Sequence, residues 1–264
     1  MGHFLSPLIV LVLLTESATT TTSSEPKTEP QGPTPGQRLE HPLAAAEEIV
    51  FRRTNEFRDG ESLSPLKRDD TLDTAAQWFA NYMAETGNYG HEADGREPAD
   101  RISAAGYKYC RVGENIAWQV RERSDGTTVP IETEPLGEKF FTGWRDSKPH
   151  RENILTPQFT HIGLGLARAG DGKYYGVQLF GRPKSLQFRV ELSNQSGEAA
   201  TYEIGEDRFE LGVRMWRQHT LCEPTPLAID DDERSVSEST RFVLTQEDGQ
   251  WTLTTDGKPR DLKP

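Results

Sequence analysis

The sequence lacks several features on which common protein functions depend. Only two of its 264 residues are cysteines, so at most one internal disulfide can form. No G-x-S-x-G pattern occurs, which removes the commonest serine-nucleophile route to hydrolysis. Basic residues are also scarce: 30 Lys and Arg face 42 Asp and Glu, giving a net charge of −12. Because phosphate binding needs a basic face, this balance argues against nucleic acid or an anionic membrane surface as partner.

A hydrophobic run long enough to cross a bilayer is also missing from the N-terminus. The apolar run at residues 4–14 is short of the roughly 20 residues that a spanning helix needs. Its length is typical of a signal peptide, although no Lys or Arg precedes it and no clean A-x-A site follows. We expect residues 1–18 to be a signal peptide, or alternatively an uncleaved anchor. The protein is then secreted, periplasmic or displayed at the cell surface.

The next segment, residues 19–41, is rich in Thr, Pro and Gly and shows no apolar periodicity. Such a segment cannot bury enough surface to offset the entropy lost on ordering, so it is predicted to be a disordered spacer. The rest of the chain contains enough apolar residues, including five Trp, for a substantial core. We expect two further domains, at residues 42–184 and 185–264.

Helical periodicity dominates the first of these domains. Apolar residues near helical spacing predict helices over residues 42–60 and 71–85, and shorter ones over 98–105 and 135–144. The stretch GWRDSKPHRENILTPQFTHIGLGL follows, with Pro149 placed where a helix can begin at His150. Pro157 then stops this helix, and alternation over residues 162–166 predicts a strand that is followed by a hairpin.

Three residues in separate motifs are candidates for chemistry. His150 opens the short helix, Glu114 lies in VGENIAWQV, and His91 lies in YGHEADG just after a long helix. Two histidines and a glutamate near the ends of elements are the residue types of a metal or acid/base site. The structural alternative is that such a histidine bonds the free amides of a helix start or faces water.

These motifs, GHEADG, GENIAW and W-x-x-S-x-x-HRENIL-x-P-x-FT-x-IGLGLA, carry a family resemblance. In order and spacing they resemble the bacterial branch of the CAP superfamily, which includes the cysteine-rich secretory proteins, antigen 5 and pathogenesis-related 1 proteins. The resemblance covers residues 44–183. It implies a three-layer α-β-α sandwich, an α/β (α+β) fold with a groove that is open to solvent.

The resemblance also implies a site of two histidines and two acidic residues in that groove. His91, Glu114 and His150 match three of the four positions. The second glutamate is expected a few residues after Trp144, where this chain has Asp146 and Ser147 instead. Metal ligation by His91, Glu114 and His150, with zinc or calcium as the cation, is therefore a hypothesis on a partial site.

Two functions follow from this site. The first is an exported, non-enzymatic module whose groove binds a small hydrophobic, glycan or peptide ligand, with at most weak binding of a divalent cation. The second is a peptidase-like, metal-assisted hydrolase in which His91 and His150 hold the ion and Glu114 takes a proton from its water. Because the family has no single agreed activity, the fold alone does not choose between them.

Beyond residue 183 the hydrophobic period changes to two. Alternation over 186–192, 202–204, 209–215, 242–244 and 251–253 predicts a small all-β, sandwich-like domain. Its His219 lies in a strand-like run, where packing is a better explanation than chemistry.

One of the two cysteines lies in each of these regions. In an exported chain Cys110 and Cys222 most simply form one disulfide, which would join the CAP-like region to the C-terminal region. Two buried free thiols are the alternative.

Overall fold

The computed structural model describes residues 41–259 of the chain. The expected signal peptide or anchor at 1–18, and nearly all of the expected spacer at 19–41, lie outside the described residues. Within residues 41–259, no helix is both long and apolar enough to cross a bilayer.

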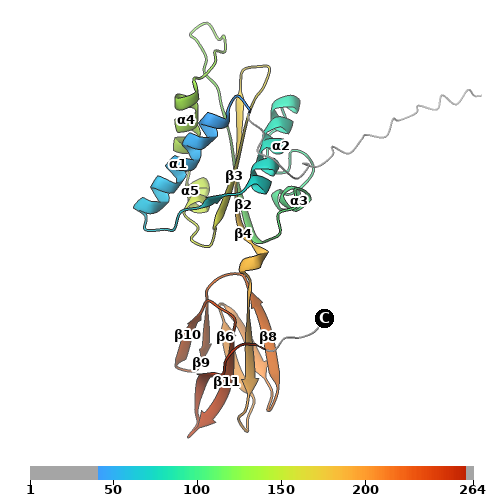
Figure 1. Ribbon diagram of the computed structural model, residues 1–264, viewed down its shortest axis with the longest axis vertical. Coiled ribbons are helices and arrows are strands. Elements are labelled where there is room, and N and C mark those ends of the chain that lie inside the picture. Colours follow the sequence, from blue (N-terminus) through green and yellow to red (C-terminus); the bar gives the residue numbers. More distant parts are fainter. Residues whose placement is uncertain (1–40, 260–264) are drawn as a thin grey trace, which may run out of the picture. The chain divides into compact units, whose positions relative to one another are not determined.

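The first part of the described chain is a sheet between two layers of helices (Figure 1). Its strands lie in the order β1-β3-β4-β2, antiparallel except for the short parallel pair β1 and β3. The elements are α1 Ala44–Gly60, β1 Lys67–Arg68, α2 Asp70–Thr86, α3 Pro98–Ala104, β2 Tyr109–Gln119, α4 Thr133–Asp146, α5 Lys148–Ile154, β3 His161–Arg168 and β4 Tyr174–Pro183.

Each helical layer buries its own hydrophobic cluster against the sheet. Helices α1, α4 and α5 cover one face, where Trp144, Phe140 and Ile154 are fully buried. Helices α2 and α3 cover the other face, where Phe79 and Ile102 are fully buried. The α-β-α sandwich expected from the sequence is therefore confirmed.

Local signals in the sequence explain where α2 begins and ends and how closely it packs. Asp69 caps its start by accepting hydrogen bonds from the N–H groups of Thr71 and Leu72. Gly87 ends it with a left-handed φ of 73°. A Cβ on Gly163 or Gly165 of β3 would lie 2.3 Å from the backbone of α2. The two glycines thus let the helix rest directly on the strand.

Buried carboxylates complete the outer edge of β3, because β1 pairs with only its first two residues. Asp73 accepts a hydrogen bond from the N–H of Leu164 at 2.8 Å, and Glu47 accepts one from Leu166 at 3.0 Å. Arg68 forms ion pairs with Asp73 at 2.7 Å and with Glu47 at 3.0 Å. Side chains therefore supply the hydrogen-bond acceptors that a longer neighbouring strand would have provided.

The chain after β4 forms two four-stranded sheets, in the orders β10-β9-β6-β7 and β12-β11-β5-β8. Buried residues of both sheets, such as Tyr202 and Leu244, share one hydrophobic cluster, so the expected sandwich-like fold is confirmed. A short 3-10 helix, η1 Lys184–Leu186, precedes the strands. These are β5 Phe188–Asn194, β6 Ala200–Ile204, β7 Asp207–Leu211, β8 Trp216–Leu221, β9 Thr225–Ile229, β10 Asp232–Val236, β11 Thr240–Glu247 and β12 Gln250–Thr255.

One predicted strand in this region is wrong in its second half. The alternation from Phe209 to Met215 suggested a single strand, but β7 ends at Leu211 and a turn follows. Val213 is 44 % exposed and Met215 is 58 % exposed, so neither belongs to the core. Hydrophobic alternation cannot distinguish a strand from a turn that displays the same residues to solvent.

Cys110 and Cys222 form the disulfide that was one of the two alternatives. It joins β2 to the loop that follows β8, and its two Cα atoms are 5.7 Å apart. Next to it, Arg111 pairs with Glu223 at 2.7 Å, and Arg182 donates a hydrogen bond to the carbonyl of Cys222. No free cysteine occurs in the described residues.

Candidate functional site

The site is centred on Glu114, whose side chain leaves β2 toward the face covered by α2 and α3. One carboxylate oxygen, Oε1, lies 2.7 Å from Nδ1 of His91, which belongs to the loop after α2. The Glu114 side chain is only 2 % exposed, whereas that of His91 is 53 % exposed. This hydrogen bond raises the pKa of His91, so the imidazole holds a proton more readily than it would in water.

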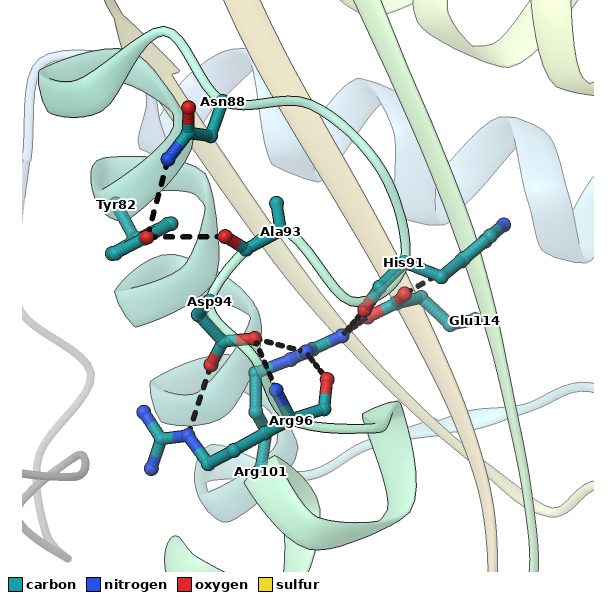
Figure 2. Close-up of polar contacts among 8 residues, drawn as sticks. All are labelled: Tyr82, Asn88, His91, Ala93, Asp94, Arg96, Arg101 and Glu114. Carbon is teal, nitrogen blue, oxygen red and sulfur yellow. Dashed lines mark hydrogen bonds and ion pairs between the residues drawn. The ribbon is translucent and has the colours of Figure 1, made fainter.

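The other carboxylate oxygen of Glu114 is held by Arg101 of α3, at 2.8 Å (Figure 2). This guanidinium is almost fully buried, and it also pairs with Asp94 at 2.7 Å. It donates further hydrogen bonds to the carbonyls of His91 and Arg96, both at 2.7 Å. Both oxygens of Glu114 therefore have fixed partners, and a single arginine ties the strand to the His91 loop.

The His91 loop is shaped by residues that the sequence places at its turns. Gly90 and Gly95 have φ angles of 148° and 78°, which only glycine adopts readily. The hydroxyl of Tyr82 donates to the carbonyl of Ala93, and the hydroxyl of Tyr89 donates to the carbonyl of Ile116 on β2. The loop is thereby fastened to α2 on one side and to the edge of β2 on the other.

His150 lies within the first turn of α5 rather than at its start, because α5 begins at Lys148 with Ser147 as its cap. The expected opening of this helix at His150 was therefore two residues too late. The Nδ1 atom of His150 is buried and has no hydrogen-bond partner. Burial lowers the pKa of His150, and the positive charge on His91 lowers it further.

Two asparagines connect the motif of Glu114 with that of His150. Asn115 donates to the carbonyl of His150 at 3.1 Å. Asn153 donates to the carbonyl of Glu114 at 3.2 Å and to the side-chain oxygen of Asn115 at 2.9 Å. These residues, together with Arg101, position the site and were not among the residues selected from the sequence. The only signal was that both asparagines lie inside the quoted motifs.

The acidic residue that stands near the expected second glutamate does not join the site. Asp146 is 59 % exposed and pairs with its neighbour Arg145 at 2.8 Å. Among residues 41–259, no group of three or more His, Cys, Asp or Glu side chains is arranged to hold one metal ion. Metal ligation by His91, Glu114 and His150 thus stays a prediction. The nitrogen donors for it would be the outer nitrogen of His91 and the unpartnered Nδ1 of His150.

Two exposed aromatic rings extend the site along β2. Trp118 is 45 % exposed and lies four residues beyond Glu114, on the same face of the strand, which is roughly 13 Å away. Tyr89 is 48 % exposed, and its ring lies 6.3 Å from that of Tyr175. Tyr175 belongs to β4 and is the residue directly opposite Trp118. The face therefore carries a charged end at His91 and an aromatic end at Trp118.

Curated relatives in Bacillus subtilis match the part of the chain that contains this site. The uncharacterized protein YkwD is 33 % identical over 129 residues, which are 48 % of this chain and 45 % of YkwD. The uncharacterized membrane protein YlbC is 25 % identical over 131 residues, which are 49 % of this chain and 33 % of YlbC. The chain thus spans less than half the length of the curated relatives it matches.

Solved structures and a family model match this region as well. An outer surface protein from Borrelia burgdorferi has a TM-score of 0.46 and 23 % identity, covering 56 % of this chain and 99 % of that one. An extracellular protein with an SCP domain from Bacillus anthracis has a TM-score of 0.44 and 24 % identity, covering 55 % and 45 %. The family model matches residues 51–180, which hold all three motifs. Those residues form a CAP domain of the cysteine-rich secretory protein family.

Proposed function

We propose that this chain is an exported binding module whose CAP domain takes a ligand along β2, beside His91, Glu114 and His150, without catalysing a reaction. The observation that carries this proposal is the state of Glu114. Its two oxygens are already hydrogen-bonded to His91 and to Arg101, and its side chain is only 2 % exposed, so water has little access to either oxygen. A general base needs such an oxygen within hydrogen-bond reach of the proton that it removes.

The exposed rings of Tyr89 and Trp118 support a ligand that extends along the strand. Aromatic rings bind the apolar faces of sugars and of peptide side chains, while the ionised end at His91 offers hydrogen bonds. Lys173 lies 5.8 Å from the centre of the Trp118 ring, which adds a cation beside the aromatic surface. This mixture favours a glycan or a peptide chain over a lipid, whose acyl tail would gain nothing from the charged end.

Ligand binding can be tested with Trp118 as the reporter. We expect an N-acetylated tetrasaccharide or an extended peptide to change tryptophan fluorescence, and palmitate to have no effect. Trp118→Ala and Tyr89→Ala should weaken binding by about tenfold or more, since each removes one ring from the contact; calorimetric titration measures this loss, because Trp118→Ala lacks the reporter ring. Trp216→Ala is a matched control, because Trp216 is similarly exposed but belongs to β8. Equal weakening in all three variants, or tight binding of palmitate alone, would contradict the proposal.

The alternative, a metal-assisted hydrolase, is favoured by one observation: the buried Nδ1 of His150 has no partner. A divalent ion there would be held by His150 and by the outer nitrogen of His91. Glu114 would then act on the far side of the His91 ring, as the carboxylate that orients a metal-binding histidine. Two nitrogens make a partial site, so the remaining positions would need water or ligand.

Calorimetric titration of the full chain with zinc and with calcium separates the two functions. We expect weak binding at best, with dissociation constants well above micromolar. Sub-micromolar zinc affinity that His150→Ala abolishes, accompanied by zinc-dependent hydrolysis of a peptide substrate, would establish the hydrolase instead. Glu152→Ala is a suitable control, because Glu152 lies on the same helix with its side chain 65 % exposed and paired with Lys148.

The disulfide supports the exported location within this proposal. Disulfides persist in secreted, periplasmic and cell-surface proteins and are rare in reducing compartments. Cys110 and Cys222 are 112 residues apart in sequence, so their pairing is a long-range structural bond. Alkylation of the protein in intact cells, without added reductant, should label neither cysteine. Labelling of both would place the protein in a reducing compartment.

A further inference from the structure

The C-terminal β region exposes apolar side chains that its own sandwich does not cover. We call residues 213–217, Val-Arg-Met-Trp-Arg, the 213–217 segment, and all five of its residues are exposed. Val213, Met215 and Trp216 are 44, 58 and 39 % exposed. Six large hydrophobic residues are exposed among those described, and three of them lie in this segment. Such a concentration of exposed apolar residues is characteristic of a contact surface rather than of a random loop.

The backbone of this turn is held firmly in place by Asn194, which is fully buried at the end of β5. The side-chain amide of Asn194 donates to the carbonyls of Leu211 at 2.9 Å and Gly212 at 3.3 Å. Its backbone N–H donates to the carbonyl of Met215 at 2.9 Å, and the N–H of Met215 donates to Gly212 at 3.1 Å. The apolar side chains are therefore displayed by a fixed turn.

Arg214 occupies the tip of this turn with a φ of 58°, in the left-handed region. That conformation costs free energy for a residue with a Cβ, and glycine or asparagine is usual there. Non-glycine residues in such conformations persist where the surroundings impose them, and they gather at functional segments. The turn thus places a cation between Val213 and Met215 at some cost to stability.

The segment itself carries basic residues although the whole chain is acidic. The chain has a net charge of −12, yet no Asp or Glu occurs between Glu210 and Glu223, where Arg214 and Arg217 lie. Charges further away than about 8 to 10 Å are largely screened at physiological salt. Glu198 lies near the base of the turn, because the Asn194 amide that holds Leu211 also donates to its carbonyl, whereas Arg214 occupies the tip. The argument from net charge against an anionic membrane surface therefore does not reach this segment.

We propose that the 213–217 segment is a membrane-contact loop that inserts Met215, Val213 and Trp216 into the headgroup region of an anionic bilayer. Arg214, at the tip of the turn, would pair with lipid phosphates. Tryptophan favours this interfacial depth, and basic residues beside a membrane are attracted by anionic lipids. A stable protein interface needs about 800 Å² on each partner, more than a five-residue turn can offer, whereas a loop tip can insert into lipid without a large surrounding surface.

Vesicle binding by the full chain tests this proposal. Co-sedimentation would compare vesicles of phosphatidylcholine alone with vesicles that also contain about one quarter phosphatidylglycerol. We expect binding to the anionic vesicles. The double variant Met215→Ser, Trp216→Ser should weaken it by at least about tenfold, because it removes two apolar side chains that the lipid would bury. Arg214→Gly should weaken binding to anionic vesicles selectively, and glycine suits the φ at this position.

Controls separate the turn from other apolar parts of the chain. Trp118→Ser removes a ring of similar exposure from the CAP domain and should leave vesicle binding unchanged. The N-terminal apolar run is present in every variant, so differences between variants report on the turn alone. In the unaltered chain, brominated lipids should quench tryptophan fluorescence, and Trp216→Phe should remove most of this quenching.

Three results would overturn the proposal: equal vesicle binding by the double variant and the unaltered chain, no binding of the unaltered chain to anionic vesicles, or quenching that survives Trp216→Phe. A concentration-dependent dimer that the double variant fails to form, without any vesicle binding, would assign the turn to contact between copies of the chain.

Discussion

The carboxylate of Asp73, in the first turn of α2, accepts a hydrogen bond from the backbone N–H of Leu164 in the middle of β3, at 2.8 Å. The same carboxylate pairs with Arg68, and both side chains are at most 12 % exposed. Helix and strand are therefore joined by a buried polar contact as well as by the close approach at Gly163 and Gly165. This contact leads to the first prediction.

Asp73→Ala should destabilise the protein by about 1 to 3 kcal/mol, the usual cost of leaving a buried donor unsatisfied, because Arg68 keeps Glu47 as an ion-pair partner. The charge of Arg68 and the N–H of Leu164 would both lose an acceptor. Urea unfolding followed by circular dichroism measures the change. Asp70→Ala is the matched control on the same helix, because Asp70 is exposed. A loss below about 1 kcal/mol for Asp73→Ala would show that the edge of β3 does not depend on this carboxylate.

The second prediction concerns the disulfide between Cys110 and Cys222. Reduction should lower the free energy of unfolding by about 2 to 5 kcal/mol, because the bond closes a loop of about 110 residues in the unfolded chain. Denaturant titrations with and without reductant measure this difference. Unreduced, denatured protein should contain no thiol that reacts with an alkylating agent. Two reactive thiols would contradict the bond itself.

The third prediction is a loss of stability in mild acid through His219. Its Nε2 lies 2.8 Å from the hydroxyl of Tyr202, and burial, followed by the charge of Arg217, lowers its pKa. The unfolded chain binds this proton near pH 6.5, and the folded chain binds it only at lower pH. Unfolding therefore becomes easier as the pH falls below about 6.5, and this contribution to stability is complete above that pH.

Melting temperatures measured from about pH 8 to about pH 5, the range in which histidines titrate, test this sign. His219→Gln should melt with a shallower dependence on pH, although His150 and His161 keep part of the slope because their pKa values are lowered as well. A variant whose melting temperature falls with acid as steeply as that of the unaltered protein would rule out His219 as a contributor.

The fourth prediction is that the CAP region folds without the C-terminal β region. The two hydrophobic clusters on either side of the first sheet contain no residue beyond 180, and the third cluster contains none before 188. A chain lacking residues 185–264, with Cys110→Ser, should unfold cooperatively and keep any ligand that binds along β2. Full-length protein with Cys110→Ser is the matched control. A folded truncation that no longer binds the ligand would show that the β region completes the site.

Sequence patterns predicted the helices and the central hairpin well. Their apolar periodicity and the residues that end each element are local features of the sequence. The helix expected over residues 71–85 lies within α2, and the strand expected over residues 162–166 lies within β3. The family motifs brought His91, Glu114 and His150 into one region. None of these predictions required knowledge of distant contacts.

The predictions that failed or were missing depend on such contacts. Two-residue β1 is too short to leave a periodic pattern, and it exists because it pairs with β3. Arg101 holds Glu114 through the fold, which no spacing in the sequence indicates. Met215 alternates as a core residue would, yet Asn194 fixes a turn that directs it outward. In each case the deciding partner lies far away along the chain or is a backbone atom.

The disulfide also determines how the molecule can respond to mechanical force. If the chain is held at one end and pulled at the other, the covalent bond carries the load past everything between Cys110 and Cys222. Those 112 peptide steps, roughly 380 Å of extended chain, cannot be drawn out while the bond is intact. Glu114 and His150 lie inside this shielded loop, whereas His91 lies outside it. Tension can therefore extend the segment that carries His91, while the part of β2 beyond Cys110, which carries Glu114, keeps its length.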